Sequence, residues 1–272
     1  MIVGSRGSAL SLAQVDLFEK TAAMSFDREI ITTEGDEDQQ TPIEEMGGKS
    51  VFCNAVEKEL LDENIDVAIH SFKDMPGEKT EGLLVVAVLP RNDPTDCLIG
   101  EITPGCVVGT SSPRRKAQIK NKFKDVEVKD IRGNVETRID KWRDGEYDAI
   151  VLASAGLNLL NIDVGQKTLD TIPAICQGII AIQVREDDQH RKHEMININH
   201  YDTWLNALME RELLVEIGGD CHTALAGHAT QHTFKAEMFE DGKHSGIIEF
   251  EAPFGGWGMA QKLREGLDSS PG

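Results

Sequence analysis

Arg114 and Arg115 stand side by side where a predicted strand gives way to a helix, and both could bind an anion. The apolar residues at 106–108 predict the end of a buried strand, Ser112 is suited to cap the helix, and Pro113 fits its first position. Cations are unfavourable in this first turn because the helix dipole is positive there. We therefore expect a carboxylate or phosphate to bind the guanidiniums, the serine hydroxyls and the free N–H groups. A solvated helix start that happens to carry arginines is the alternative.

A second group of reactive side chains follows the apolar segment 65–69, which predicts a short buried strand. Ser71, Lys73 and Asp74 come directly after it, and ligands of parallel α/β sheets bind beyond the carboxyl ends of the strands. A carboxylate and an amine at that edge are candidates for acid–base chemistry. Taken alone, Asp74 is better explained as a turn residue before Pro76.

Arginines or serines follow at least four predicted strands, and this repetition indicates an anion site more strongly than any one position does. The further positions are Arg6, Ser8 and Gln14 after the strand at 2–4, Ser111 beside Ser112, Arg132, Gly133 and Arg138 after the strand at 126–131, and Ser154 after the strand at 148–153.

Two motif-like segments are interpreted without a ligand. Gly48-Lys49-Ser50 imitates the end of a phosphate-binding P-loop, but Ile43 stands where that motif needs glycine, and no strand precedes it. We expect a mobile acidic loop there instead. His190 and His193 have no acidic or cysteine partner at metal spacing, so we expect surface side chains and no metal.

Composition limits the class of protein. At 272 residues and 40% apolar content, the chain can form two or three ordinary globular domains. It has no apolar run of the ~20 residues that a membrane span needs, and it enters a strand without a signal-peptide pattern, so we expect a cytoplasmic protein. Its five cysteines form no C-x-x-C pair, which argues against a disulfide framework or zinc site and favours small buried hydrophobes.

Charge is unevenly distributed. The net charge of −19 disfavours nucleic acid and anionic membranes as partners. Residues 114–143, however, hold eleven basic and five acidic side chains, a net of +6, which leaves −25 on the rest of the chain. A basic segment in an acidic protein indicates a local anion site, although some of its lysines belong to a solvated helix face.

The remaining pattern is that of an α/β protein. A turn at 91–94 is a plausible hinge, 171–178 is a plausible crossover, and the strand at 179–184 could rejoin the first sheet. From residue 201 a small α+β domain follows, with a helix at 204–215, strands at 234–239 and 246–251, and a helix near 259–267. The other predicted strands lie at 30–33 and 83–89, and the other predicted helices begin near Leu10, Val51 and Val135.

Assembled in order, these segments resemble the hydroxymethylbilane synthase (porphobilinogen deaminase) family nearly end to end. Seven such motifs in one order and at compatible spacing are highly specific. The matching residues are Ser5 to Ser8 with Gln14, Gly47-Gly48-Lys49, His70 to Pro76, Val108 to Arg115, Arg132-Gly133-Asn134 with Arg138, Gly145 to Ala149, and Gly219-Asp220-Cys221.

The resemblance implies an α/β fold with two doubly wound, periplasmic-binding-protein-like domains, a cleft between them, and a small C-terminal α+β domain. We expect the first domain at 1–93 and 177–198, the second at 97–173 and the third at 200–272.

The resemblance also implies the reaction. The family joins four porphobilinogens onto a dipyrromethane cofactor, losing ammonia each time, and then releases the linear tetrapyrrole by hydrolysis. The cofactor is held by a cysteine through a thioether, and the matching residue is Cys221. We expect the chain to act as a monomer on the small molecule porphobilinogen.

Residue roles follow from the same resemblance. Asp74 is the matching catalytic carboxylate, and it would stabilise positive charge that develops at the pyrroles. The cofactor contacts besides Cys221 are Lys73, Ser111, Ser112, Arg114, Arg115, Arg132 and Gly133, and the substrate contacts are Arg6, Ser8, Gln14, Lys49, Ser71 and Arg138. Each pyrrole carries an acetate and a propionate, which suits these guanidiniums.

Three departures from the family pattern lie near these positions. No arginine occurs between Asn158 and Gln166, where the family often has one. Asp220 replaces a common glycine before Cys221 and should raise the pKa of that thiol. Ala224 stands where a proline is usual.

Two alternatives stay open at this point. A non-catalytic two-lobed protein that binds a small polyanion would explain the arginines and the hinge, but not Asp74 beside Lys73 or the third domain. An inactive relative that keeps the fold without loading the cofactor stays open because of the changes around Cys221. The cofactor content separates both from the enzyme.

Overall fold

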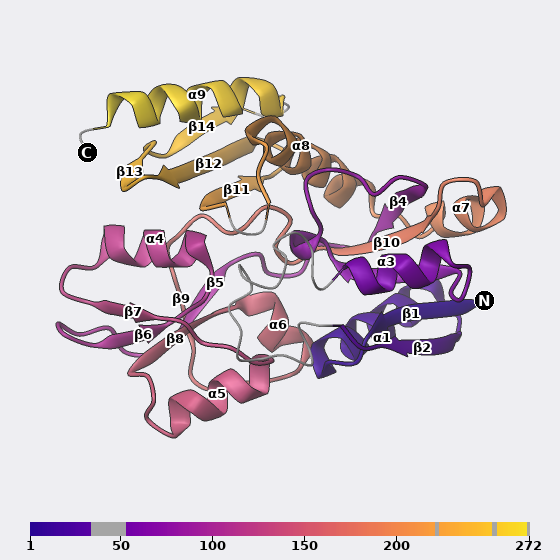
Figure 1. Ribbon diagram of the computed structural model, residues 1–272, viewed down its shortest axis with the longest axis horizontal. Coiled ribbons are helices and arrows are strands. Elements are labelled where there is room, and N and C mark those ends of the chain that lie inside the picture. Colours follow the sequence, from indigo (N-terminus) through magenta and orange to yellow (C-terminus); the bar gives the residue numbers. More distant parts are fainter. Residues whose placement is uncertain (34–52, 221–222, 252–254, 271–272) are drawn as a thin grey trace.

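The computed structural model describes residues 1–33, 53–220, 223–251 and 255–270. The chain forms three sheets with helices packed against them, and the two larger sheets lie beside each other below the small C-terminal one (Figure 1). The mixed α/β character expected from the sequence is confirmed. Within the described residues, no helix combines the length and apolar character of a membrane span.

The first sheet has the strand order β2-β1-β3-β10-β4. Strands β1, β2 and β3 are parallel, whereas β10 runs antiparallel to both of its neighbours. The predicted return of the chain to this sheet is therefore confirmed. Its strands are β1 (Ile2–Arg6), β2 (Asp27–Ile31), β3 (Val67–Ser71), β4 (Leu83–Val88) and β10 (Ile180–Arg185), and its helices are α1 (Ala9–Ala22), α3 (Asn54–Leu61) and α7 (Gln189–Ile196).

The second sheet repeats this plan with the order β7-β6-β8-β5-β9. Here β6, β7 and β8 are parallel, and β5 is the antiparallel strand beside β8. In each sheet the antiparallel strand is the first one along the chain after it crosses from the other sheet. The elements are β5 (Asp96–Gly100), β6 (Val107–Gly109), β7 (Glu127–Lys129), β8 (Ala149–Ala153), β9 (Lys167–Thr168), α4 (Pro113–Lys122), α5 (Val135–Arg143) and α6 (Ser154–Leu159).

The C-terminal sheet is antiparallel, with β12 between β11 and β14 and a short pairing with β13. Its core is continuous with the first sheet, because Leu213 and Phe234 belong to the same buried cluster as Phe72 and Ile175. The elements are α8 (Tyr201–Ile217), β11 (Leu225–Ala229), β12 (Thr233–Glu240), β13 (Lys243–His244), β14 (Ile248–Glu251) and α9 (Gly256–Ser269), the last covering the sheet in Figure 1.

The two crossings between the large sheets are bonded to each other. The Asn92 amide donates to the Gly178 carbonyl at 2.9 Å. Gly178 has a φ of +83°, and a Cβ there would lie 2.5 Å from the Asn92 carbonyl oxygen, so the position needs glycine. The two segments that connect the large sheets, at 91–94 and 171–178, thus lie side by side and are hydrogen-bonded to each other.

Some local predictions differ from the structure. The strand expected at 30–33 begins earlier, at Asp27, because β2 is an edge strand whose polar residues face solvent. Strand β11 was not predicted, since Leu225–Ala229 lacks branched and aromatic residues and its extended form depends on pairing with β12. The four cysteines within the described residues are buried, as expected: Cys53, Cys97, Cys106 and Cys176.

Candidate active site

The predicted turn after β6 is present and is fastened to the next loop. Ser112 caps α4 by accepting a hydrogen bond from the Arg115 amide at 3.4 Å, with Pro113 at the first helical position. The Ser111 hydroxyl donates to the Ile131 carbonyl at 2.8 Å and accepts from the Ile131 amide at 3.0 Å. The start of α4 is therefore held against the loop that follows β7.

Arg114 and Arg115 turn inward to a single carboxylate, Asp96 at the start of β5. Arg114 Nη1 lies 2.6 Å from Asp96 Oδ2, and Arg115 Nη2 lies 2.7 Å from Asp96 Oδ1. All three side chains are less than a tenth exposed. In the structure, the anion that binds these two arginines is the side chain of Asp96. The sequence did not identify this residue as their partner.

This internal triad revises the interpretation of the two arginines. Burial opposes the charge of Asp96, but the two guanidiniums outweigh it and hold the pKa of its carboxyl well below the usual range. Arg114 Nε is a buried donor without a hydrogen-bond partner among the described residues. Direct contact of Arg114 and Arg115 with a ligand stays a prediction, since most of their donors already bind Asp96 and nearby carbonyls.

Gln177 in the crossover connects this triad to the first sheet. Its amide nitrogen donates to Asp96 Oδ1 at 2.9 Å and to the Pro94 carbonyl at 2.7 Å. Its oxygen accepts from Arg115 Nη2 and from Lys73 Nζ, each at 3.4 Å. One glutamine therefore joins both crossings, the second sheet and the Lys73 loop, and it was not identified from the sequence.

Lys73 lies among charges of both signs. Burial lowers the pKa of its amine to about 8, Asp74 opposes this fall, and Arg115 adds to it. At neutral pH the amine is still mostly protonated, and its desolvation strengthens its attraction for a carboxylate.

Asp74 ends the short 3₁₀ turn that follows β3. Its carboxylate is half-buried and makes no hydrogen bond or ion pair with any described residue. Its charge raises the pKa values of Lys73 and Arg138, which shows that both cations lie near it. The backbone of Asp74 is fixed, since the Cys53 thiol donates to its carbonyl at 3.3 Å.

Arg138 reaches the same place from the second sheet. Asn134 caps α5 by accepting from the Thr137 amide at 2.9 Å, and Arg138 Nε donates to the Gly133 carbonyl at 2.7 Å. Burial lowers the pKa of Arg138 to about 10, with Arg115 and Arg132 adding to the fall. Its Nη groups make no hydrogen bond within the described residues, so they are available to an anion.

The first helix supplies two more of the predicted side chains. Gln14 Nε2 donates to the Ser71 hydroxyl at 2.7 Å, although the two residues are 57 positions apart. Ser8 caps α1 by accepting from the Ser11 amide at 3.2 Å. Arg6 is the last residue of β1, half-buried at the same sheet edge.

Cys221 and Lys49 lie outside the described residues. The backbone just before Cys221 is described, and it lies against the Asp74 loop: a Cβ on Gly77 would be 3.0 Å from the Gly219 carbonyl oxygen. The Asp220 carboxylate accepts from the Thr223 hydroxyl at 3.4 Å, so the residue that departs from the family pattern bonds to a side chain three positions further along the chain.

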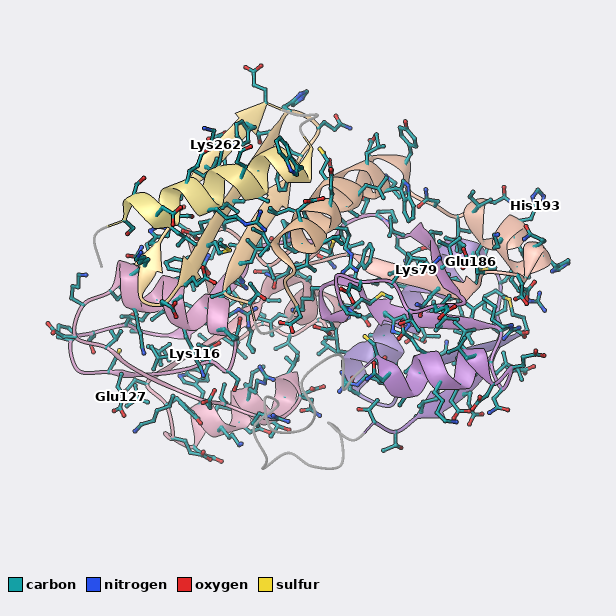
Figure 2. All side chains as sticks on the ribbon, turned by 45° about the horizontal axis from the view of Figure 1, so that its top comes forward. Lys79, Lys116, Glu127, Glu186, His193 and Lys262 are labelled. Carbon is teal, nitrogen blue, oxygen red and sulfur yellow. The ribbon has the colours of Figure 1, made fainter. Side chains whose placement is uncertain are left out.

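The histidines set aside from the sequence lie elsewhere. His190 and His193 are exposed on α7, and Figure 2 shows His193 at the edge of the molecule. No group of three metal-ligating side chains occurs among the described residues.

The fold and the site together define a two-lobed α/β protein whose strand ends present cations, capped helix starts and the carboxylate of Asp74, which has no partner among the described residues. This donor set fits a ligand that carries several carboxylates, because guanidinium and ammonium groups flank the space next to Asp74. The carboxylate itself suits chemistry that develops positive charge.

Comparison with known proteins identifies the family. Residues 1–193 match the family described as "Porphobilinogen deaminase, dipyromethane cofactor binding domain". The porphobilinogen deaminase of Lysinibacillus sphaericus is 41% identical over 249 residues, covering 85% of this chain and 80% of that protein. A probable porphobilinogen deaminase of Archaeoglobus fulgidus is 38% identical over 243 residues, covering 84% and 83%. The chain belongs to the porphobilinogen deaminase family.

The comparison with solved structures gives matches of low similarity. A probable amino-acid ABC transporter extracellular-binding protein from Bacillus subtilis matches with a TM-score of 0.44 and 12% identity, over 72% of this chain and 88% of that protein.

Proposed function

We propose that this chain is a transferase that condenses four porphobilinogen molecules, with loss of ammonia, on a dipyrromethane attached to Cys221, and then releases hydroxymethylbilane by hydrolysis. Family membership supports the reaction and the cofactor. The observation that carries the site assignment is the unpartnered carboxylate of Asp74 beside Lys73 and Arg138.

In this proposal the cations bind and orient. Lys73 and the free Nη groups of Arg138 hold acetate and propionate side chains, and Arg6 and Arg132 extend this surface along the strand ends. Ser8, Ser71, Ser112 and the helix starts add neutral donors. When bound, the dipyrromethane supplies two linked pyrrole rings to which new units are added.

Asp74 performs the chemistry of the chain itself. Its carboxylate accepts hydrogen bonds from pyrrole N–H groups and stabilises the positive charge that develops there. It also moves protons at the reacting pyrrole. Its position is held without using its carboxylate oxygens, because only the backbone carbonyl bonds to Cys53.

The internal triad acts as a scaffold. Asp96 neutralises Arg114 and Arg115 in the interior. Gln177 accepts hydrogen bonds from both Arg115 and Lys73 and so links the triad to Lys73. The helix start of α4 is thereby fixed before any ligand arrives.

We further propose that the protein works as a cytoplasmic monomer, without nucleic acid or membrane partners. The net charge of −19 supports the absence of nucleic-acid and anionic membrane partners, because it repels polyanionic surfaces.

Intact mass under denaturing conditions tests the function. We expect the wild-type chain to carry the excess mass of two linked pyrrole units, Cys221→Ala to lack it, and Cys106→Ala, which removes a buried cysteine elsewhere, to retain it. Incubation with porphobilinogen should then add further units to wild type. A bare mass before and after incubation would favour a polyanion-binding protein or an inactive relative.

A further inference from the structure

Arg211 of α8 grips the loop that carries Asp74. Its Nη1 donates to the Met75 carbonyl at 3.0 Å, and its Nη2 donates to the carbonyls of Pro76 and of Gly77, the latter at 3.1 Å. Three consecutive carbonyls of one loop therefore converge on one guanidinium. Such a cluster fixes the backbone more tightly than a single hydrogen bond can.

The same guanidinium also contacts Phe72, which precedes Asp74 in the loop. Its central carbon lies 4.9 Å from the centre of the Phe72 ring, a cation–π contact. Arg211 therefore touches residues on both sides of the Lys73–Asp74 pair. Phe72 is buried in the core shared with the C-terminal domain, so the ring is itself immobile.

Arg211 has no carboxylate partner among the described residues, which distinguishes it from the buried Arg114 and Arg115. Burial lowers the pKa of its guanidinium, and the surrounding carbonyls compensate for part of the lost hydration. Arg211 is half-buried, and its hydrogen bonds among the described residues all go to backbone carbonyls of the loop.

The helix that carries Arg211 also leads to the cofactor cysteine. The neighbouring residue Glu210 forms an ion pair with Arg91 in the connection between the large sheets. Cys221 follows ten residues after Arg211. The loop at Gly77 rests against Leu214 and Gly219 at the end of this helix.

We propose that Arg211 is a positioning residue, which sets the position of Asp74 relative to the end of α8 by fixing the backbone of residues 72–77. The assignment rests on the proposed role of Asp74 in turnover. It adds a residue of the C-terminal domain that acts through the loop and touches no ligand.

Hydrogen exchange of the peptide covering residues 72–77 gives the direct test. In Arg211→Met, which keeps the side-chain length but removes the donors, we expect exchange to be about tenfold faster or more. Arg211→Lys retains the charge with a single ammonium group, so its exchange should be intermediate and it provides a second variant if the first folds poorly. Unchanged exchange in both variants would overturn the proposal.

Kinetics on cofactor-loaded protein separate positioning from general stability. We expect Arg211→Met to lower kcat by about 10- to 100-fold with KM changed less than about threefold, and Arg211→Lys to recover part of the loss. A variant that melts earlier but keeps the wild-type kcat and loop exchange would show a merely structural arginine.

Lys79→Met is the matched control. Lys79 lies in the same loop, and its Nζ is 2.9 Å from Glu186 Oε2 in an exposed pair (Figure 2). Its removal should leave loop exchange and kcat unchanged. If Asp74→Asn turned over porphobilinogen normally, the proposed function would fail, while the exchange result would still decide whether Arg211 fixes the loop.

Discussion

Arg91 Nη1 lies 2.6 Å from Glu210 Oε1, which joins the connection between the large sheets to helix α8. Glu210 is fully buried, and it also accepts from the amides of Cys176 and Ala229, the latter at 2.8 Å. Burial opposes the charge of Glu210, but Arg91 and His228 together outweigh it, and the pKa of the carboxyl is lowered. One carboxylate thus holds two crossings and one strand in place.

Glu210→Ala should destabilise the chain by about 3–5 kcal/mol, because it leaves the Arg91 charge and two amides unpaired in the interior. Denaturant unfolding followed by circular dichroism measures this change. The neighbouring exposed Glu212→Gln is the control, and a loss for Glu210→Ala as small as that of the control would contradict the buried ion pair.

Asp96→Asn should cost a similar ~3–5 kcal/mol near neutral pH, since two buried guanidiniums lose their shared anion. The folded pKa of Asp96 is depressed, so its stabilisation is fully present above the unfolded value of about 4 and is lost as pH falls toward the folded value. Unfolding free energies of wild type and variant should therefore converge below about pH 4. A constant difference down to pH 2 would be inconsistent with this linkage. Asp130→Asn, which removes the exposed pair with Lys116, should show little change at any pH.

Asp74→Ala should lower turnover of porphobilinogen by about 10³-fold or more while the protein stays folded, because its carboxylate has no partner among the described residues to lose. Steady-state rates and thermal unfolding measure the two properties together. Glu78→Gln, an exposed acid in the same loop, is the control. Near-normal turnover in Asp74→Ala would remove this residue from the mechanism.

Substrate affinity should fall at alkaline pH through Lys73. Burial lowers the pKa of its amine to about 8, so the positive charge that attracts a carboxylate is lost as pH rises through that value. KM for porphobilinogen should then rise by up to about tenfold per pH unit above 8. Lys73→Arg, whose guanidinium stays charged, should flatten this limb. An identical alkaline rise in both proteins would assign the titration to another group.

The stability effect of Lys73 has the opposite direction. Its folded pKa lies below its unfolded one, so the unfolded chain binds more protons between about pH 8 and 10.5, and this residue's contribution to stability rises over that interval.

Much of the site could be predicted from local sequence. Ser112 was predicted to cap its helix, and it does, because a capping residue acts within one helical turn and its role follows from neighbours in the chain. The alternation of apolar strands and amphipathic helices likewise determined the α/β class, and the motifs around Asp74 indicated the family before any coordinates.

Only the tertiary structure decided how charges pair across the chain. Asp96 meets Arg114 from 18 positions away, Gln177 meets Asp96 from 81, and Arg211 meets Met75 from 136. Such partners share no periodicity, because side chains that are distant in sequence are brought together by the packing of sheets and crossings. The sequence alone indicated which residues could bind an anion. The packing determined that two of them, Arg114 and Arg115, are paired with a carboxylate of the chain itself, Asp96.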